Sequence, residues 1–132
     1  MLKILRISNK KISIDNIEIL TYIKKFNNIK YNDMLIYELD EICFCGAMGK
    51  LIVYVVQGKI YKLAFSCINI HNIFGISPDF DAYNTFLAEM EENYRQQNKN
   101  EFYNKRFEFK ILKNDNNFVT IIRGRDYAVN EI

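Results

Sequence analysis

Three cysteines and one histidine are the residues of this chain whose chemistry best suits a reactive or metal-binding site. One residue separates Cys43 from Cys45, and His71 lies four positions after Cys67. Three thiolates and one imidazole are a complete ligand set for a tetrahedral zinc site. However, paired zinc ligands normally have two or more residues between them, and a free cysteine often serves as a small buried apolar side chain. We therefore expect core packing, and we keep a small Cys/His metal protein as the third functional hypothesis.

The sequence supports a catalytic site even less than a metal site. A nucleophilic pair of Cys67 and His71 would need a third group that orients the imidazole, and the sequence suggests none. General acid–base chemistry would need one carboxylate of a pair in an apolar cleft that shifts its pKa. We therefore predict that the protein is not an enzyme and needs no cofactor. The acidic pairs lie where solvated or capping roles suffice: Asp40-Glu41, Asp79 with Asp81, and Glu91-Glu92.

A basic and aromatic segment near the end of the chain is the best candidate for binding nucleic acid. Its cations could lie on one side of a terminal hairpin, with a tyrosine ring available for stacking on a base. Acidic residues dilute the positive charge, so a nucleic-acid-binding accessory domain is the second hypothesis. The residues concerned are Tyr103, Lys105, Arg106, Lys110, Arg123 and Arg125.

The charges of the chain occur in blocks, although the net charge is only +2. Residues 1–30 carry a net +5, residues 31–49 a net −4, residues 79–92 a net −5 and residues 95–113 a net +4. Such blocks usually mark solvated faces, but one of them can be a docking surface. We expect Asp81, Glu91 and Glu92 to form a partner-binding face on a helix.

The elements that must position these residues centre on a hairpin over residues 50–67. Gly58-Lys59 separates two apolar runs, and glycine at the first central position indicates a type II′ turn. The first run is apolar on both faces, so we expect a central strand that is covered, or nearly covered, on both sides. Its residues alternate as Leu51, Val53 and Val55 on one face and Ile52, Tyr54 and Val56 on the other.

Upstream of the hairpin, residues 34–45 alternate as a strand whose phase slips at Asp40-Glu41, which indicates a bulge or a turn. Residues 46–49 are expected to form a loop, so residues 34–67 make an antiparallel meander of three or four strands. Near the start of the chain, residues 2–14 predict a short hairpin. Asp15 then resembles an N-cap, with Glu18 completing a capping box, and the apolar spacing predicts a helix over residues 16–27.

A second helix is expected to begin at Ser77 and Pro78, because proline at the first helical position wastes no hydrogen bond. Its apolar stripe includes Tyr83, Met90 and Tyr94, and the polar run over residues 95–100 ends or frays it. Residues 107–125 predict a closing hairpin around a turn at residues 114–117.

These elements predict an α+β fold: a mostly antiparallel sheet, made of the central meander and the terminal hairpin, with two amphipathic helices packed on it. We expect residues 1–132 to form a single compact domain. Three cysteines cannot all pair, and neither a secretory signal nor an apolar span is evident. A cytoplasmic location without membrane attachment is therefore expected.

The first functional hypothesis is a small cytoplasmic protein-binding domain, because no catalytic set is evident. Its most specific form is a toxin-neutralising immunity protein of a bacterial competition system. The composition is rich in Asn, Ile and Lys, as in an AT-rich genome, and charged blocks suit a protein that covers a toxin. This is an analogy of kind. A basic toxin would meet the acidic face of Asp81, Glu91 and Glu92, since complementary charge speeds association.

Overall fold

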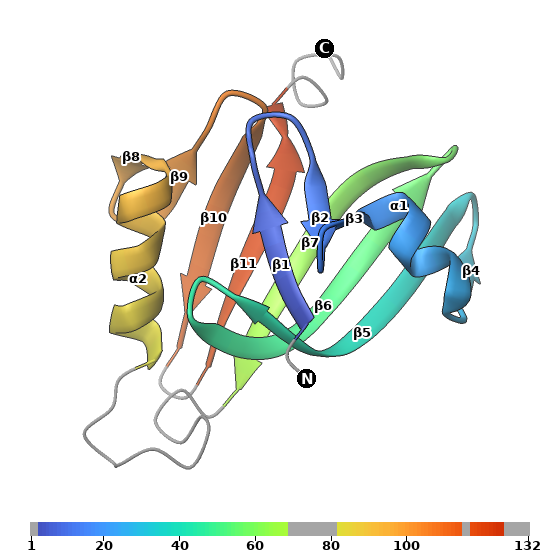
Figure 1. Ribbon diagram of the computed structural model, residues 1–132, viewed down its shortest axis with the longest axis horizontal. Helices are drawn as coiled ribbons and strands as arrows, with labels where there is room; N and C mark the ends of the chain where they lie inside the picture. Colours follow the sequence, from blue (N-terminus) through green and yellow to red (C-terminus); the bar gives the residue numbers. More distant parts are fainter. Residues whose placement is uncertain (1–2, 69–81, 115–116, 126–132) are drawn as a thin grey trace.

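The computed structural model describes residues 3–68, 82–114 and 117–125 (Figure 1). Strands make up 61% of these residues, and the two α-helices are short. The eleven described strands form one sheet in the order β3-β2-β1-β5-β6-β7-β11-β10-β9-β8, with β4 also paired to β5. The predicted antiparallel sheet is confirmed except that β1 pairs with β5 in parallel. The fold is thus predominantly β, and the expected α+β balance is only partly met.

The predicted central meander is present as β5 (Met34–Phe44), β6 (Ala47–Val56) and β7 (Lys59–Ile68). The phase slip is a bulge between Leu39 and Ile42, where the φ of Glu41 is 57°. Two turns differ from the predictions. Gln57 and Gly58 both have positive φ, 52° and 74°, which defines a type I′ turn rather than type II′. Cys45-Gly46 is likewise a two-residue turn, so the expected four-residue loop is absent there.

The N-terminal hairpin is confirmed as β1 (Lys3–Ile7) and β2 (Ile12–Ile14), but the helix predicted over residues 16–27 is mostly wrong. Asp15 and Asn16 adopt positive φ and turn the chain into β3 (Ile17–Glu18), a conformation that Asx residues tolerate. The Asp15 carboxylate accepts a hydrogen bond from the Ile4 amide at 3.0 Å instead of capping a helix. The chain continues through α1 (Ile19–Tyr22), η1 (Ile23–Lys25) and β4 (Ile29–Tyr31).

The second predicted helix is α2 (Ala82–Asn93), although its predicted start at Ser77 lies outside the described residues. Tyr83, Phe86 and Met90 are buried, as the apolar stripe requires. The polar run that follows forms strands, β8 (Arg95–Asn98) and β9 (Glu101–Tyr103), which is a correction, because pairing with the neighbouring hairpin outweighs the weak strand propensity of the run. The closing hairpin is confirmed as β10 (Phe107–Lys113) and β11 (Asn117–Gly124).

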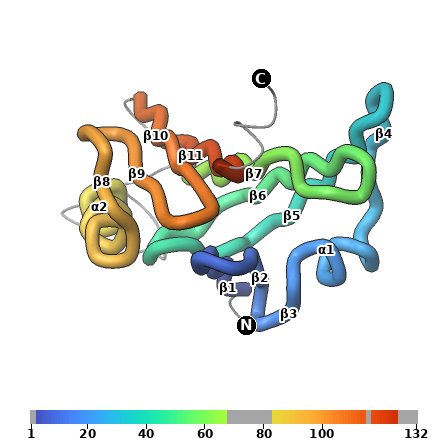
Figure 2. Tube along the Cα trace, turned by 90° about the horizontal axis from the view of Figure 1, so that it is seen from above, coloured from blue at the N-terminus to red at the C-terminus, as the bar shows by residue number. Residues whose placement is uncertain are grey.

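Figure 2 shows from above how the sheet curls. Its concave side encloses an aromatic core. We call the side that faces this core the inner face. Phe86 of α2 lies among aromatic residues of three strands, with ring centroids 6.1 Å from Phe65, 5.8 Å from Phe44 and 4.6 Å from Phe118. At the end of α2, the Tyr94 hydroxyl donates a hydrogen bond to the Ile7 carbonyl at 2.9 Å. The helix therefore bridges the sheet to the edge of β1.

Candidate binding surfaces

The three thiols do not form one cluster. Burial and the nearby Glu89 raise the pKa of Cys43, and burial, Glu89 and Cys43 raise the pKa of Cys45 to about 12. Cys67 is fully buried on β7, and burial alone raises its pKa to about 11. All three cysteines are free thiols, and at neutral pH they are protonated, which makes them weak nucleophiles and weak metal ligands.

His71 lies outside the described residues, so its distance from the thiols is not tested. Among the described residues, no group of three or more His, Cys, Asp and Glu side chains could hold a metal ion. Cys45 instead contacts the core side of α2, with its Sγ atom 3.6 Å from the Met90 Sδ atom. This contact fits the packing role that the sequence favoured for the cysteines.

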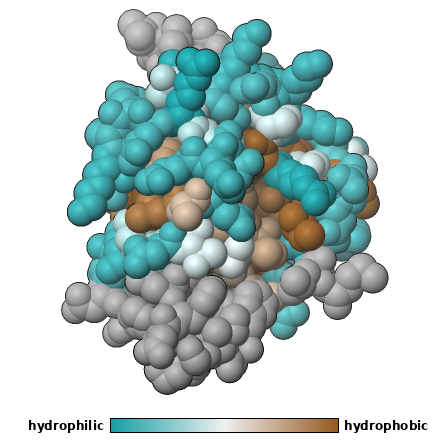
Figure 3. All heavy atoms as spheres, turned by 60° about the vertical axis from the view of Figure 1, so that its left-hand side comes forward, coloured by the Kyte–Doolittle hydropathy of each residue, from teal (hydrophilic) through white to brown (hydrophobic). Residues whose placement is uncertain are grey.

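The acidic face of α2 is exposed at Glu91 and Glu92, whereas Asp81 lies outside the described residues. Figure 3 views the molecule from the side of α2, where hydrophilic side chains cover much of the surface around a hydrophobic middle. Glu89 belongs to the same helix but is half-buried beside the β5–β6 turn. The helix thus offers two exposed carboxylates to a partner, and whether a partner contacts them stays a prediction.

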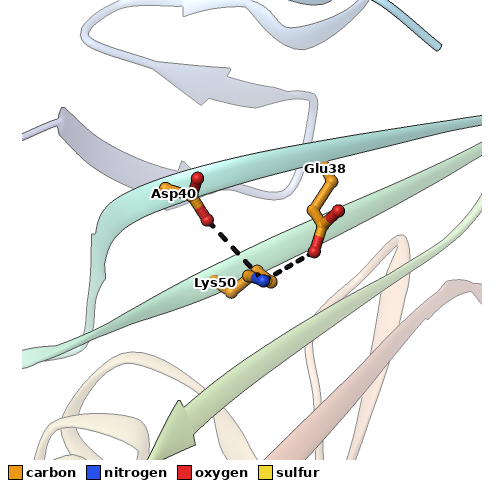
Figure 4. Close-up of polar contacts among 3 residues, drawn as sticks. All are labelled: Glu38, Asp40 and Lys50. Atoms are coloured by element: carbon orange, nitrogen blue, oxygen red, sulfur yellow. Dashed lines mark ion pairs between the residues drawn. The ribbon is translucent and has the colours of Figure 1, made fainter.

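A second acidic group lies on the outer face of the sheet, the side away from the core. Lys50 Nζ is 2.6 Å from Glu38 Oε1 and 3.8 Å from Asp40 Oδ1 (Figure 4). The side chains of Lys50 and Glu38 are 43% and 53% exposed. Glu38 raises the pKa of the exposed Lys50 ammonium, first through this hydrogen bond and then through its charge. These carboxylates are therefore already partnered within the sheet.

The predicted nucleic-acid residues separate into two groups. On the outer face, Arg123 lies opposite Glu108 and Lys110 lies opposite Glu101. The alternation of acids and bases dilutes any positive field there. The second group consists of Tyr103, Lys105, Arg106 and Arg125, which lie at the end of the sheet near the β1–β2 turn. The hairpin thus does not present its six residues as one surface.

Large apolar side chains gather at one corner of the outer face, where β4 forms an edge of the sheet (Figure 1). Directly opposite residues on paired strands share a face, and the register gives two adjacent rows across β4, β5 and β6. Ile29 and Tyr31 are 65% and 66% exposed, and the other members are half-buried. We call this patch the apolar corner: Ile29, Ile36 and Tyr54 in one row, Tyr31, Met34 and Val56 in the next.

Two lysines border the apolar corner on the side of β7. Lys62 lies opposite Tyr54, and Lys59 lies opposite Val56. The Lys62 ammonium is 4.8 Å from the centroid of the Tyr54 ring, a distance at which a cation is attracted to the ring face. The border of the corner is therefore positively charged on this side.

The apolar corner corrects one expectation from the sequence. Because β6 is apolar on both faces, we expected both faces to be covered or nearly so. Among the described elements, the aromatic core and α2 cover its inner face, whereas Ile52, Tyr54 and Val56 on the outer face stay half-exposed. Alternating apolar residues in 29–36 would have indicated the corner only together with the strand register, which the sequence does not specify.

Comparisons with known proteins add no relative. No protein-family model matches the chain, and neither the curated proteins nor the solved structures include a significant match. No helix within residues 3–68, 82–114 and 117–125 has the length and apolar character that crossing a membrane requires. The functional argument therefore depends on the chain's own surfaces.

Proposed function

We propose that the protein is a binding domain for another protein and that the apolar corner is its contact surface. The observation that carries the proposal is the half-exposed apolar outer face of β6 near two of the most exposed large apolar residues, Ile29 and Tyr31. Contiguous exposed apolar side chains on a folded domain commonly mark a protein-interaction site. Tyrosine supplies a large contact area at a low entropic cost, which suits the centre of an interface.

The partner segment proposed here is an extended strand that adds to β4. In the described part of the chain, β4 pairs with β5 alone, so its other edge has backbone groups available for strand addition. Apolar side chains of the added strand would extend the rows of Ile29 and Tyr31. Lys59 and Lys62 lie at the opposite border of the corner, on β7, where acidic groups of the same partner outside the added strand would meet them.

A second copy of this chain is a poorer occupant of the same edge. Antiparallel pairing of two β4 strands about their middle residue would place Lys30 directly opposite Lys30 of the other copy. Like charges directly opposite each other destabilise a strand pair. A central lysine on a short edge strand is a common protection against self-pairing, and it favours a partner of different sequence and opposite charge.

The toxin-neutralising immunity protein remains the most specific form of this proposal, with a toxin as the partner. A cytoplasmic location, which the free thiols favour, belongs to the same form. The exposed carboxylates of Glu91 and Glu92 provide a second possible contact, as the sequence suggested. The immunity role requires that the partner is toxic when expressed alone and harmless when this chain is coexpressed.

Capture of the partner with matched variants tests the proposal. Tagged wild-type chain is expressed in its host and isolated at low salt, together with the corner variant Tyr54→Ser/Val56→Ser and the helix variant Glu91→Lys/Glu92→Lys. We expect one stoichiometric protein to accompany the wild type and the helix variant and to be lost with the corner variant. Loss with the helix variant alone would move the contact to α2 and contradict the corner.

A further inference from the structure

The β1–β2 turn and the β9–β10 turn, which are far apart in the sequence, are joined by hydrogen bonds at one end of the molecule. Within the β9–β10 turn, Asn104 Nδ2 donates to the Ser8 carbonyl at 3.1 Å, and the Lys105 amide donates to Asn9 Oδ1 at 2.8 Å. Arg106 Nη1 donates to the Lys10 carbonyl at 2.6 Å. These three hydrogen bonds hold the β1–β2 turn against the β9–β10 turn. The backbone that carries the surrounding cations is therefore fixed in place.

The junction gathers cations from four separate segments. Lys10 and Lys11 come from the β1–β2 turn, Lys59 follows the β6–β7 turn, and Lys105 and Arg106 come from the β9–β10 turn. Arg125 joins them at the end of β11, where its amide donates to the Arg106 carbonyl at 2.7 Å. All six side chains are exposed, and within the described residues none forms an ion pair. We call these six residues the cationic ridge.

A hollow lies on each side of the cationic ridge. On one side, Lys10, Lys11, Lys59 and Arg106 border a hollow of about 580 Å³ whose acidic member is Glu18. On the other side, Lys105 and Arg125 border a second hollow of about 580 Å³ together with Tyr103, and Glu92 is its acidic member. The Arg125 guanidinium lies 4.9 Å from the centroid of the Tyr103 ring.

We propose that the cationic ridge is a binding site for single-stranded nucleic acid. A row of cations can follow a phosphate backbone, and an aromatic ring beside it provides a surface on which a base stacks. Tyr103 is half-exposed and takes this role, while the side-chain amides of Asn9 and Asn104 in the same hollow hold the two turns together. The site differs from the hairpin surface expected from the sequence, because it includes Lys10, Lys11 and Lys59 and excludes Lys110 and Arg123.

The site shares none of the six residues of the apolar corner, although Lys59 also borders that corner, and it can be tested with a defined probe. The probe is a fluorescein-labelled oligothymidylate of about 12 nucleotides, a length that a small domain can cover, and binding is followed by fluorescence anisotropy as salt is raised from about 50 mM. Three variants are compared with the wild type: Lys10→Gln/Lys11→Gln on the ridge, Tyr103→Leu beside it, and Lys99→Gln/Lys110→Gln away from it. The two double variants remove the same charge, so they separate the ridge from net charge. Urea midpoints confirm that each variant is folded.

We expect the wild type to bind at low salt and the ridge variant to bind at least about tenfold more weakly, with a salt slope smaller by about 1.4. Tyr103→Leu should weaken binding with an unchanged slope, and the charge-matched control and Tyr54→Ser should bind as the wild type does. Absent binding at low salt, or equal losses in the two double variants, would overturn the proposal. Equal displacement of the probe by polyglutamate would also overturn it and would identify an acidic protein surface as the ligand of the ridge.

Discussion

The two faces of β6 carry similar residues but meet different surroundings. Leu51 and Val53 on the inner face are fully buried, whereas Tyr54 and Val56 on the outer face stay half-exposed. The inner residues are enclosed by the aromatic core and α2, and the outer ones lie one strand away from β4, whose second edge has no partner among the described strands. An apolar strand face therefore indicates that burial of that face is favourable. Only the tertiary structure shows whether other elements of the same chain bury it.

The largest contrast between the faces should appear when one aromatic residue is removed from each. Phe65→Ala on the inner face should lower the free energy of unfolding by about 3–5 kcal/mol, because it leaves a cavity in a closed core. Tyr54→Ala on the outer face should cost about 1 kcal/mol or less, as is usual for a surface position. Urea denaturation measures both. Equal costs would mean that the outer face is as enclosed as the inner one.

Substitution of a glycine on β6 should show how closely β6 and β7 of the central meander are packed. A Cβ atom on Gly49 would lie 2.0 Å from the Ser66 carbonyl oxygen of β7, so Gly49→Ala should force the two strands apart. We expect a loss of about 1–3 kcal/mol, typical of overpacking. Gly58→Ala is the comparison within the same hairpin, because its Cβ atom would meet open space and the variant carries only the strain of its positive φ of 74°. A Gly49→Ala protein with wild-type stability would contradict the close approach of β6 and β7.

The buried thiols should make the stability fall in alkaline solution. Folding raises the pKa of Cys67 from 9.0 to about 11 and that of Cys45 to about 12. The folded state holds these protons more tightly, so the stability they contribute is complete below pH 9.0 and declines as pH rises through the folded pKa values. Urea midpoints should decline less steeply above pH 9.0 in Cys45→Ala/Cys67→Ala than in the wild type. Identical declines would show that the thiols do not titrate in this way.

The smallest effect should come from the ion pairs of the outer face. Lys50→Gln removes contacts with Glu38 and Asp40, and exposed pairs of this kind contribute about 1 kcal/mol or less. The loss should shrink further when salt screens the charges. Denaturation at low and high salt measures it. A cost of several kcal/mol would indicate that this part of the outer face is covered rather than open.

The sequence predicted the sheet better than the surfaces. Period-two alternation and turn residues located the meander, the bulge near Glu41 and both terminal hairpins, because these features are local. The helix predicted from the apolar spacing over residues 16–27 is mostly wrong. The positive φ angles of Asp15 and Asn16 turn the chain there, and Ile17 and Glu18 pair with β2 as a strand instead.

The binding surfaces depended on contacts that the sequence does not specify. The apolar corner needs the register of β4 with β5 and β6, which unites residues from three strands. The cationic ridge needs the β1–β2 turn to meet the β9–β10 turn across 96 positions of the chain. Local patterns contain neither contact, so the proposed ridge keeps Lys105, Arg106 and Arg125 from the sequence prediction and adds Lys10, Lys11 and Lys59 from the structure.

Site-specific photo-cross-linking in the host tests the central claim most directly. Benzoylphenylalanine replaces Ile29 in the apolar corner or Leu112 on β10, two outer-face residues that are 65% and 53% exposed. The proposal predicts one discrete cross-linked protein from position 29, none from position 112, and loss of the product when Tyr54→Ser is added. Equal products from both positions, or a product that survives Tyr54→Ser, would contradict the apolar corner as the partner-binding surface.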